Sequence, residues 1–347
     1  MPETPPAVPQ RRFGAGGLTL ADVGERALVA MLVEIAGATG RRAESVSGDD
    51  AAVWTPPPAS DLAVSIDALV EGVDFRRTWI SPRQLGRRAF AVAASDLSAM
   101  GAKPAFCLAT LCARGSEQLD DILEIQRGLG DAASVAGCAV VGGDVSAIDG
   151  PLVVDVCITG ALPAGRSLRR AAGRPGDVLL VTGVLGRAAA GLRLLVERRA
   201  PRTAVEEGWV AAQLQPVSRL AEGRRLLKAG VRCAGDISDG LLLDAARTAQ
   251  ACGCAAELWA GSLPVDEQLQ QCFGRDWLKL AAGGGEDFEL LVAVAESDVA
   301  HLRAAWPDTL APLSEVGRLS EGSGVRLLDK RGGTEMPLPP SASEHFA

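Results

Sequence analysis

The chain has 347 residues, of which 48% are hydrophobic and 22% charged, so it can form a sizeable core and is long enough for two domains. Its formal net charge of −8, its aromatic content of only 4% and its lack of tyrosine argue against a nucleic-acid partner, which would need a basic, base-stacking surface. Its apolar runs fall short of the roughly 18–20 residues that a membrane helix requires.

The eight cysteines mostly lie in or beside apolar stretches, where a cysteine is usually a small buried hydrophobe. Cys252 and Cys254 have no second cysteine pair at zinc spacing, so we interpret them as core residues. We therefore expect a cytoplasmic protein with neither a membrane nor a nucleic acid as its partner.

The first half of the chain mixes helices and strands. Residues 1–18, rich in proline and glycine, are predicted to be a flexible segment. Apolar spacing predicts helices at 19–37, 82–102 and 119–137, and strands at 61–69, 105–113, 138–144 and 152–162. We assign residues 19–162 to an N-terminal α/β domain.

A turn-rich basic segment, 163–177, is the best candidate for a domain boundary. We assign residues 163–347 to a second α/β domain. Its predicted strands are 178–183 and 288–294, its predicted helices are 185–199, 218–230 and 239–253, and 314–333 is predicted to form short strands and turns.

Acidic residues recur in both halves at the ends of apolar runs or in glycine-rich turns. They are Asp49, Asp50, Asp67, Asp96, Asp144, Asp236, Asp239, Glu286 and Asp287. Ligands gather at strand ends in open sheets, and converging carboxylates need a cation. Carboxylates alone suit Mg²⁺, which proteins typically share with nucleotide phosphates. The glycine-rich turns "VGGDV" and "AGGGED" would let backbone N–H groups approach an anion.

Any one of these acids could instead form a turn or cap a helix, as Asp239 could before "GLLLDAA". The recurrence of the pattern favours a shared metal site. Other catalytic classes fit poorly, because the chain has no G-x-S-x-G elbow, no G-x-x-x-x-G-K-[ST] loop and only two histidines, His301 and His345.

Six segments, in order, resemble the motif series of the thiamine-monophosphate kinase family, in the aminoimidazole ribonucleotide synthetase superfamily. They are "SGDDAAV", "SIDALVEGVDF", "AASDLSAMGAKP", "VGGD", "DISDGLLLD" and "GGGEDFEL". The resemblance implies a two-domain α/β fold whose N-terminal sheets pair in a homodimer. It also implies an enzyme that uses ATP and several Mg²⁺ ions to convert thiamine monophosphate to thiamine diphosphate, by direct transfer without a phosphoenzyme.

The resemblance also implies a role for individual residues. The implied metal ligands are Asp50, Asp67, Asp96, Asp144, Asp236 and Asp239. The implied nucleotide contacts are Ser65, Gly143, Arg170 and Ser238, and the implied substrate contact is Glu286. No side chain is implied as nucleophile or general base, because an acceptor phosphate is already ionised.

The departures from the family pattern concern the acceptor. Asp74 replaces a histidine, and Ser343 stands where the family has an aromatic residue, so we assign both positions to the substrate site. Asp74 would repel an acceptor phosphate unless it turned toward Arg76, Arg77 or a bound cation. Two alternatives therefore stay open: a related phosphotransferase with another acceptor, and a non-catalytic ATP-binding regulator.

Overall fold

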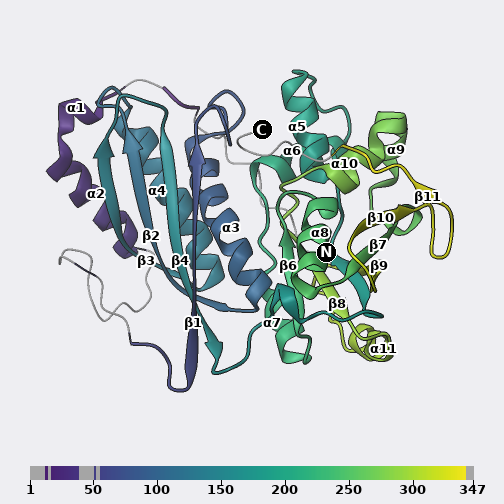
Figure 1. The fold of residues 1–347 in the computed structure, drawn as a ribbon. Coiled ribbons are helices and arrows are strands. Elements are labelled where there is room, and N and C mark those ends of the chain that lie inside the picture. Colours follow the sequence, from purple (N-terminus) through teal and green to yellow (C-terminus); the bar gives the residue numbers. More distant parts are fainter. Residues whose placement is uncertain (1–11, 15–16, 39–50, 52–54, 341–347) are drawn as a thin grey trace. The chain divides into compact units, whose positions relative to one another are not determined.

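The computed structural model describes residues 12–14, 17–38, 51 and 55–340 (Figure 1). The chain forms two compact units. The first unit comprises Met1–Pro56, Val64–Ala93 and Pro104–Thr159, and the second unit comprises Pro57–Ala63, Ala94–Lys103 and Gly160–Ala347. The domain division between residues 162 and 163 stays a prediction, because two short segments of the first half group with the second unit.

A four-stranded sheet in the order β1-β4-β2-β3 forms the centre of the first unit. Its strands are β1 (Ser60–Val70), β2 (Lys103–Ala113), β3 (Ala139–Ala147) and β4 (Val153–Pro163). Burial alternates along β2, where Cys107, Ala109, Leu111 and Ala113 are buried and the residues between them are more exposed. This period of two is typical of a sheet with one face packed against helices.

The helices of this part of the chain are α1 (Leu20–Val23), α2 (Glu25–Ala38), α3 (Pro82–Met100) and α4 (Leu119–Ala136). Helices α2 and α4 contact each other and β3, on one side of the sheet (Figure 1). The single helix predicted over 19–37 is divided at Gly24, because Thr19 and Asp22 form a capping box around the one-turn helix α1. Gly137 ends α4 in the left-handed conformation, as the sequence predicts.

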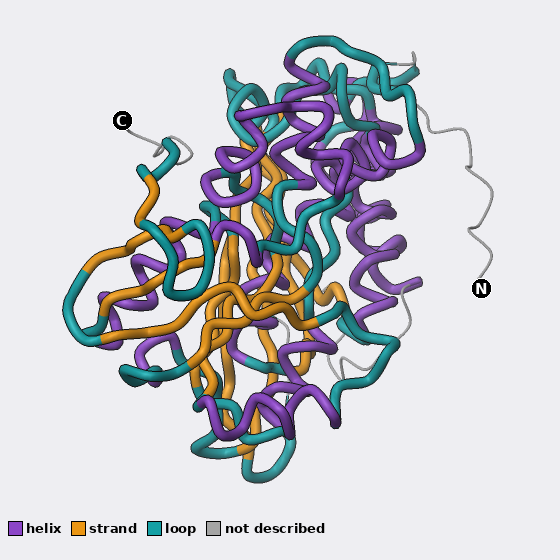
Figure 2. Tube along the Cα trace, turned by 90° about the vertical axis from the view of Figure 1, so that its right-hand side faces the viewer, coloured by secondary structure: helices purple, strands orange, loops and turns teal. Residues whose placement is uncertain are grey.

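The second unit is built on a seven-stranded mixed sheet in the order β11-β10-β7-β9-β5-β8-β6. Figure 2 draws the strands in orange and the helices in purple. Its strands are β5 (Val178–Thr182), β6 (Cys233–Ile237), β7 (Ala255–Trp259), β8 (Glu289–Val294), β9 (Leu313–Ser320), β10 (Gly324–Leu328) and β11 (Glu335–Met336). Strands β5, β6, β7 and β8 are buried along their whole length. They therefore form the hydrophobic core of this unit with the helices that cover them.

The α-helices of the second unit are α5 (Arg187–Val196), α6 (Ala204–Leu214), α7 (Leu220–Lys228), α8 (Leu241–Cys252), α9 (Glu267–Phe273), α10 (Trp277–Gly283) and α11 (Glu296–Ala304). Its described residues also form three short 3-10 helices: η1 (Arg170–Ala172), η2 (Ala260–Ser262) and η3 (Gly274–Asp276). Helix α8 packs on the sheet, in contact with β6, β7, β8 and β10. None of the helices within the described ranges has the length and apolar character needed to span a membrane.

Candidate functional site

Three of the predicted site residues lie together in the second unit. Helix α3 carries Asp96 one turn before its end, and strand β6 carries Asp236, which is only 4% exposed. The Ser95 hydroxyl donates a 2.9 Å hydrogen bond to Asp236 Oδ2, and Arg170 Nη2 lies 3.4 Å from Asp236 Oδ1. Asp96 therefore lies inside a helix that continues to Met100, and the apolar run before Asp96 does not end in a turn.

The negative charges near Asp236 favour the binding of a cation. Burial, followed by the nearby charge of Asp96, raises the pKa of Asp236 to about 6, although the Ser95 hydrogen bond and Arg170 act in the opposite direction. The Arg170 guanidinium contacts Asp236 from a half-exposed position. The two carboxylates fit Mg²⁺, which prefers carboxylate oxygens. Within the described ranges, however, no three Asp, Glu, His or Cys side chains form a group that could hold a metal ion.

The loop after β6 is organised by Asp244, in the first turn of α8. This buried carboxylate accepts hydrogen bonds from the backbone N–H groups of Ser238, at 3.1 Å, and Asp239, at 3.0 Å. Burial raises the pKa of Asp244, while the hydrogen bond from Asp239 opposes that shift. Asp244 therefore fixes the backbone of two predicted site residues.

The Asp239 side chain pairs with Arg247 of α8, which also contacts Asp244. A carboxylate in this ion pair would have to leave Arg247 before it could bind a metal. Asp239 as a metal ligand stays a prediction, and Asp236 is the better placed of the two.

The loop 283–288 brings Glu286 against the same segment. The Glu286 N–H donates a 2.7 Å hydrogen bond to the carbonyl of Ser238, and a Cβ on Gly285 would lie 2.6 Å from that carbonyl oxygen. Glu286 has a left-handed backbone, with φ at 68°, which is strained for a non-glycine residue and is found at functional sites. Its Oε2 accepts a 2.5 Å hydrogen bond from Nε2 of Gln213 on α6.

Asp287 points to a different partner. Its two oxygens accept hydrogen bonds from the N–H groups of Gly186, at 2.7 Å, and Ala188, at 3.2 Å, at the start of α5. Burial nevertheless raises the pKa of Asp287 to about 7. Asp287 thus caps a helix, so of the two acids in "GGGED" it is Glu286 that fits a substrate contact.

The first unit holds four more of the predicted site residues, on two strands. Ser65 and Asp67 lie on β1, and Gly143 and Asp144 lie on β3, where the Ser146 hydroxyl donates a 3.0 Å hydrogen bond to Asp144 Oδ2. Strands β1 and β3 are the two edges of the sheet. Three strand spacings, roughly 14 Å along the sheet, therefore separate the two pairs.

Close packing of the backbone requires a glycine at position 143. A Cβ at this position would lie 1.8 Å from the carbonyl oxygen of Ala109 on the paired strand β2. Gly143 and Asp144 also line a pocket of about 230 Å³ whose other walls include Val29 and Val33 of α2. A ligand could therefore meet both an apolar wall and the predicted nucleotide-contacting glycine.

Asp74 closes the turn after β1. Its Oδ2 accepts a 2.8 Å hydrogen bond from the N–H of Val70. The cations beside it have other partners, since Arg77 pairs with Glu71 and Glu117, and Arg76 lies 4.8 Å from the ring centroid of Trp79. The two remaining predicted residues, Asp50 and Ser343, lie outside the described residues.

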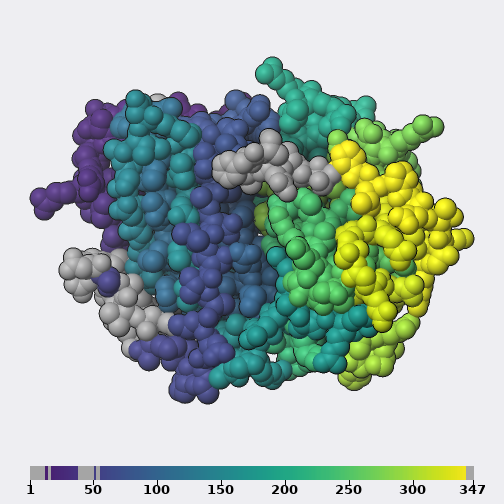
Figure 3. Space-filling model, in the orientation of Figure 1, coloured from purple at the N-terminus to yellow at the C-terminus, as the bar shows by residue number. Residues whose placement is uncertain are grey.

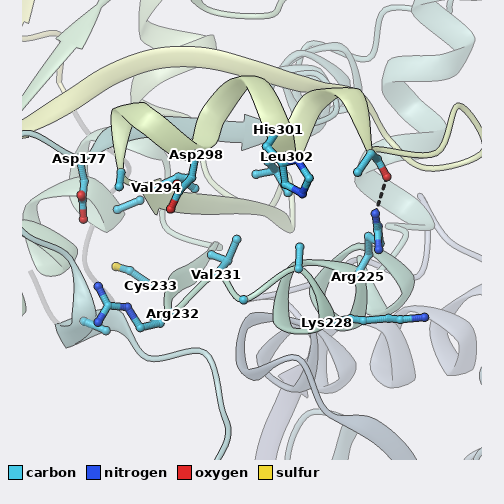
Figure 4. A pocket seen from close by; sticks show the side chains of 16 residues that line it. Asp177, Arg225, Lys228, Val231, Arg232, Cys233, Val294, Asp298, His301 and Leu302 are labelled. Carbon is cyan, nitrogen blue, oxygen red and sulfur yellow. Dashed lines mark hydrogen bonds between the residues drawn. The ribbon is translucent and has the colours of Figure 1, made fainter.

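A larger pocket, of about 520 Å³, opens elsewhere in the second unit, between α7 and α11 (Figure 4). Asp298 and His301 extend from α11 on one wall, and Arg232 and Lys228 lie on the opposite one. Its lining in the described part of the chain includes none of the predicted site residues. The acidic pattern, and not the size of a pocket, therefore locates the candidate site.

Three residues around the site were not predicted from the sequence. Ser95 and Asp244 lie in the same sequence motifs as Asp96 and Asp239, so the sequence could have indicated both of them. Gln213 has no such signal, because its contact with Glu286 spans 73 residues of sequence.

Known proteins match this chain over most of its length. The model of the AIR synthase related protein N-terminal domain matches residues 48–162, and that of the C-terminal domain matches residues 174–330. Thiamine-monophosphate kinase of Bacillus subtilis (strain 168) is 30% identical over 301 residues, which cover 86% of this chain and 92% of that relative.

Solved structures agree with these matches. Thiamine-monophosphate kinase from Stenotrophomonas maltophilia K279a is 33% identical with a TM-score of 0.78, covering 86% of this chain and 96% of that one. AaThiL complexed with AMPPCP and TMP is 28% identical with a TM-score of 0.72, covering 94% and 98%. These matches confirm the predicted two-domain α/β fold. The chain therefore belongs to the AIR synthase related proteins and, within them, to the thiamine-monophosphate kinase family.

Proposed function

We propose that this protein is a thiamine-phosphate kinase that transfers the γ-phosphoryl group of ATP directly to thiamine monophosphate, giving thiamine diphosphate and ADP. The observation that carries the proposal is the buried Asp236, with the charge of Asp96 nearby and Arg170 in contact with it, in a chain of this family. The structural neighbour that binds both AMPPCP and TMP supports the same substrates.

The proposed chemistry needs positioning and charge compensation, and no side-chain nucleophile. The acceptor phosphate is ionised at neutral pH, so it can attack in line without a general base. Asp96 and Asp236 would hold Mg²⁺, together with Asp50, Asp67, Asp144 and Asp239 as the sequence predicts. Bound Mg²⁺ would neutralise phosphate oxygens as charge shifts toward the leaving group.

The chain's own groups would bind the two substrates. Arg170, which contacts Asp236, would also bind nucleotide phosphate oxygens, and Ser238, on the loop that Asp244 holds, would be a second nucleotide contact. Ser65 and Gly143 are proposed nucleotide contacts on the first unit. Glu286, with its strained backbone, would contact the thiamine moiety.

We also propose that the protein is a homodimer whose first units pair through their sheets. Val64 and Ile66 of β1 are 66% and 62% exposed, and Leu108 of β2 is 36% exposed, and each stands between more buried residues of its strand. Figure 3 shows the surface of this part of the chain, from purple to teal, in the orientation of Figure 1. Apolar side chains on one sheet face favour burial against a second sheet. The separation of Asp67 from Asp144 on opposite sheet edges is consistent with a site that a second copy completes.

A cytoplasmic location is part of the same proposal. All eight cysteines are free thiols, and Cys107, Cys138, Cys233 and Cys254 are buried. Free thiols in the core are typical of proteins from a reducing compartment.

The main competing function is an ATP-binding regulator that lacks an acceptor site. Asp74 favours this alternative, because its negative charge would repel an acceptor phosphate. Isothermal titration in the presence of Mg-AMPPCP separates the two. A kinase should bind thiamine monophosphate with a saturable heat, whereas a regulator should bind Mg-AMPPCP and give no heat with thiamine monophosphate.

A further inference from the structure

We infer that Gln213 is a positioning residue that holds the Glu286 carboxylate in the orientation needed to recognise the cationic body of the acceptor. The inference rests on the proposed function, since it assigns Glu286 to the acceptor. It concerns a residue that makes its contact from a separate helix, α6.

The backbone of Glu286 is fixed, but a fixed backbone does not orient the side chain. The N–H of Glu286 is bound to the Ser238 carbonyl at 2.7 Å, and the adjacent Gly285 packs too closely on that carbonyl to carry a Cβ. A glutamate nevertheless has three side-chain torsions beyond its Cα, and ordering them costs conformational entropy. A second contact near the carboxylate is therefore needed to select one orientation before the substrate arrives.

Gln213 makes that contact from a well-ordered position. Its side chain is buried, with 4% exposure, near the end of α6, and its Nε2 lies 2.5 Å from Glu286 Oε2. A short hydrogen bond to an ionised acceptor is among the stronger hydrogen bonds in proteins. Because the Gln213 side chain is itself held by packing, its hydrogen bond restricts the Glu286 carboxylate to one orientation.

The chemical type of residue 213 also fits this role. A carboxamide orients a carboxylate and leaves its negative charge in place, whereas lysine or arginine would neutralise it. A carboxylate that keeps its charge is suited to a cationic ligand, and the thiazolium ring of thiamine carries a positive charge. The neighbouring acid, Asp287, is turned toward the N–H groups of Gly186 and Ala188, so it does not compete for this role.

The test compares Gln213→Leu with the full-length wild-type protein. Leucine keeps most of the volume and removes the donor. We expect the KM for thiamine monophosphate, and its Kd measured by titration with Mg-AMPPCP present, to rise about tenfold, which corresponds to about 1.4 kcal/mol. The KM for ATP and kcat should stay within about twofold. Gln213→His, whose Nε2–H reaches a similar distance from the Cα, should restore most of the affinity.

Gln250→Leu, the same change at an exposed position of α8, is the matched control and should leave all these constants unchanged. A structural role alone would lower the melting temperature of Gln213→Leu and leave the Kd for thiamine monophosphate as in the wild type, which would overturn the inference. If Gln213→Leu fails to fold, Gln213→Asn, one methylene shorter, carries the same comparison. A wild-type protein that binds no thiamine monophosphate would overturn the proposed function, and this inference with it.

Discussion

Ser95 and Asp236 are 141 residues apart in the sequence, and the Ser95 hydroxyl donates a 2.9 Å hydrogen bond to the Asp236 carboxylate. The contact joins helix α3 to strand β6 and sets Asp96, the next residue along the helix, near the buried Asp236. The nearby charge of Asp96 adds to the effect of burial in raising the pKa of Asp236, and close carboxylates favour a bound cation. Two motifs from different halves of the sequence therefore contact each other in the structure.

Asp96→Asn and Asp144→Asn should each lower kcat/KM by at least roughly a hundredfold, because each removes a charge that is proposed to hold Mg²⁺ against the transferring phosphoryl group. Steady-state kinetics with Mg-ATP and thiamine monophosphate measures the effect. Asp308→Asn, the same change at an exposed position, should leave the rate unchanged. Variants with a lowered melting temperature and near-normal specific activity would show that the two acids are structural only.

Asp287 should make the protein less stable as the pH rises from about 4 to about 7. Its folded-state pKa, about 7, is above the value of 3.8 expected for an unfolded chain, so the unfolded state releases its proton first and gains stability over this range. The full shift corresponds to roughly 4 kcal/mol. We expect about half of that, because residue Asp287 as a whole is only partly buried.

Urea unfolding at several pH values tests this prediction with Asp287→Asn, whose side chain does not titrate. The free energy of unfolding should fall less between pH 4 and pH 7 in the variant than in the wild type. Equal slopes for the two proteins would mean that the pKa of Asp287 is close to its ordinary value.

Gly143→Ala should destabilise the first unit whether or not a nucleotide is bound, because its Cβ would lie 1.8 Å from the Ala109 carbonyl oxygen. Strand β3 would have to move away from β2, at a cost of about 2 kcal/mol or more. Thermal unfolding measures the loss. Gly142→Ala, whose Cβ would meet only the end of the Leu108 side chain at 3.3 Å, is the control and should be milder. Equal melting temperatures for the two variants would contradict the packing argument.

Asp74→His should lower the KM for thiamine monophosphate and leave the KM for ATP nearly unchanged, because it removes a negative charge from the predicted acceptor site. Two unit charges about 4 Å apart repel by roughly 4 kcal/mol at an effective dielectric of 20, before screening. Asp74→Asn separates charge from structure, since its amide oxygen can still accept the hydrogen bond from Val70. Loss of activity in both variants would instead mean that the Asp74 carboxylate is itself a working ligand.

Elements with a clear apolar run or periodicity could be predicted from the sequence, including the buried strands β5 and β8, and elements without such a pattern could not. Helix α4 was found by its apolar spacing and its stop at Gly137, and β1 by its alternation. Strand β6, "CAGDI", is buried at every position and has small residues and an acid, so it shows neither period. Helix α6 was also missed, and it carries Gln213.

The same limit applies to the site. Recurrent acids and glycine-rich turns indicated Asp96, Asp236, Ser238 and Glu286, and the structure brings Asp96 to Asp236 and Ser238 to Glu286 within one unit. The supporting contacts of Ser95, Asp244 and Gln213 depend on tertiary structure, and a sequence pattern does not encode which buried side chain a distant loop will meet. The motif also indicated Asp239, but it gave no sign that the Asp239 carboxylate forms an ion pair with Arg247.

The central claim is that this protein makes thiamine diphosphate, and chromatographic detection of that product tests it most directly. Purified protein is incubated with Mg-ATP and thiamine monophosphate, with free thiamine as the control acceptor and with EDTA replacing Mg²⁺ in a parallel sample. We predict formation of thiamine diphosphate and ADP in equal amounts, dependent on Mg²⁺, with free thiamine a poor acceptor because its neutral hydroxyl would need a general base. A folded protein that binds Mg-ATP and yields no thiamine diphosphate at saturating substrate would contradict the account.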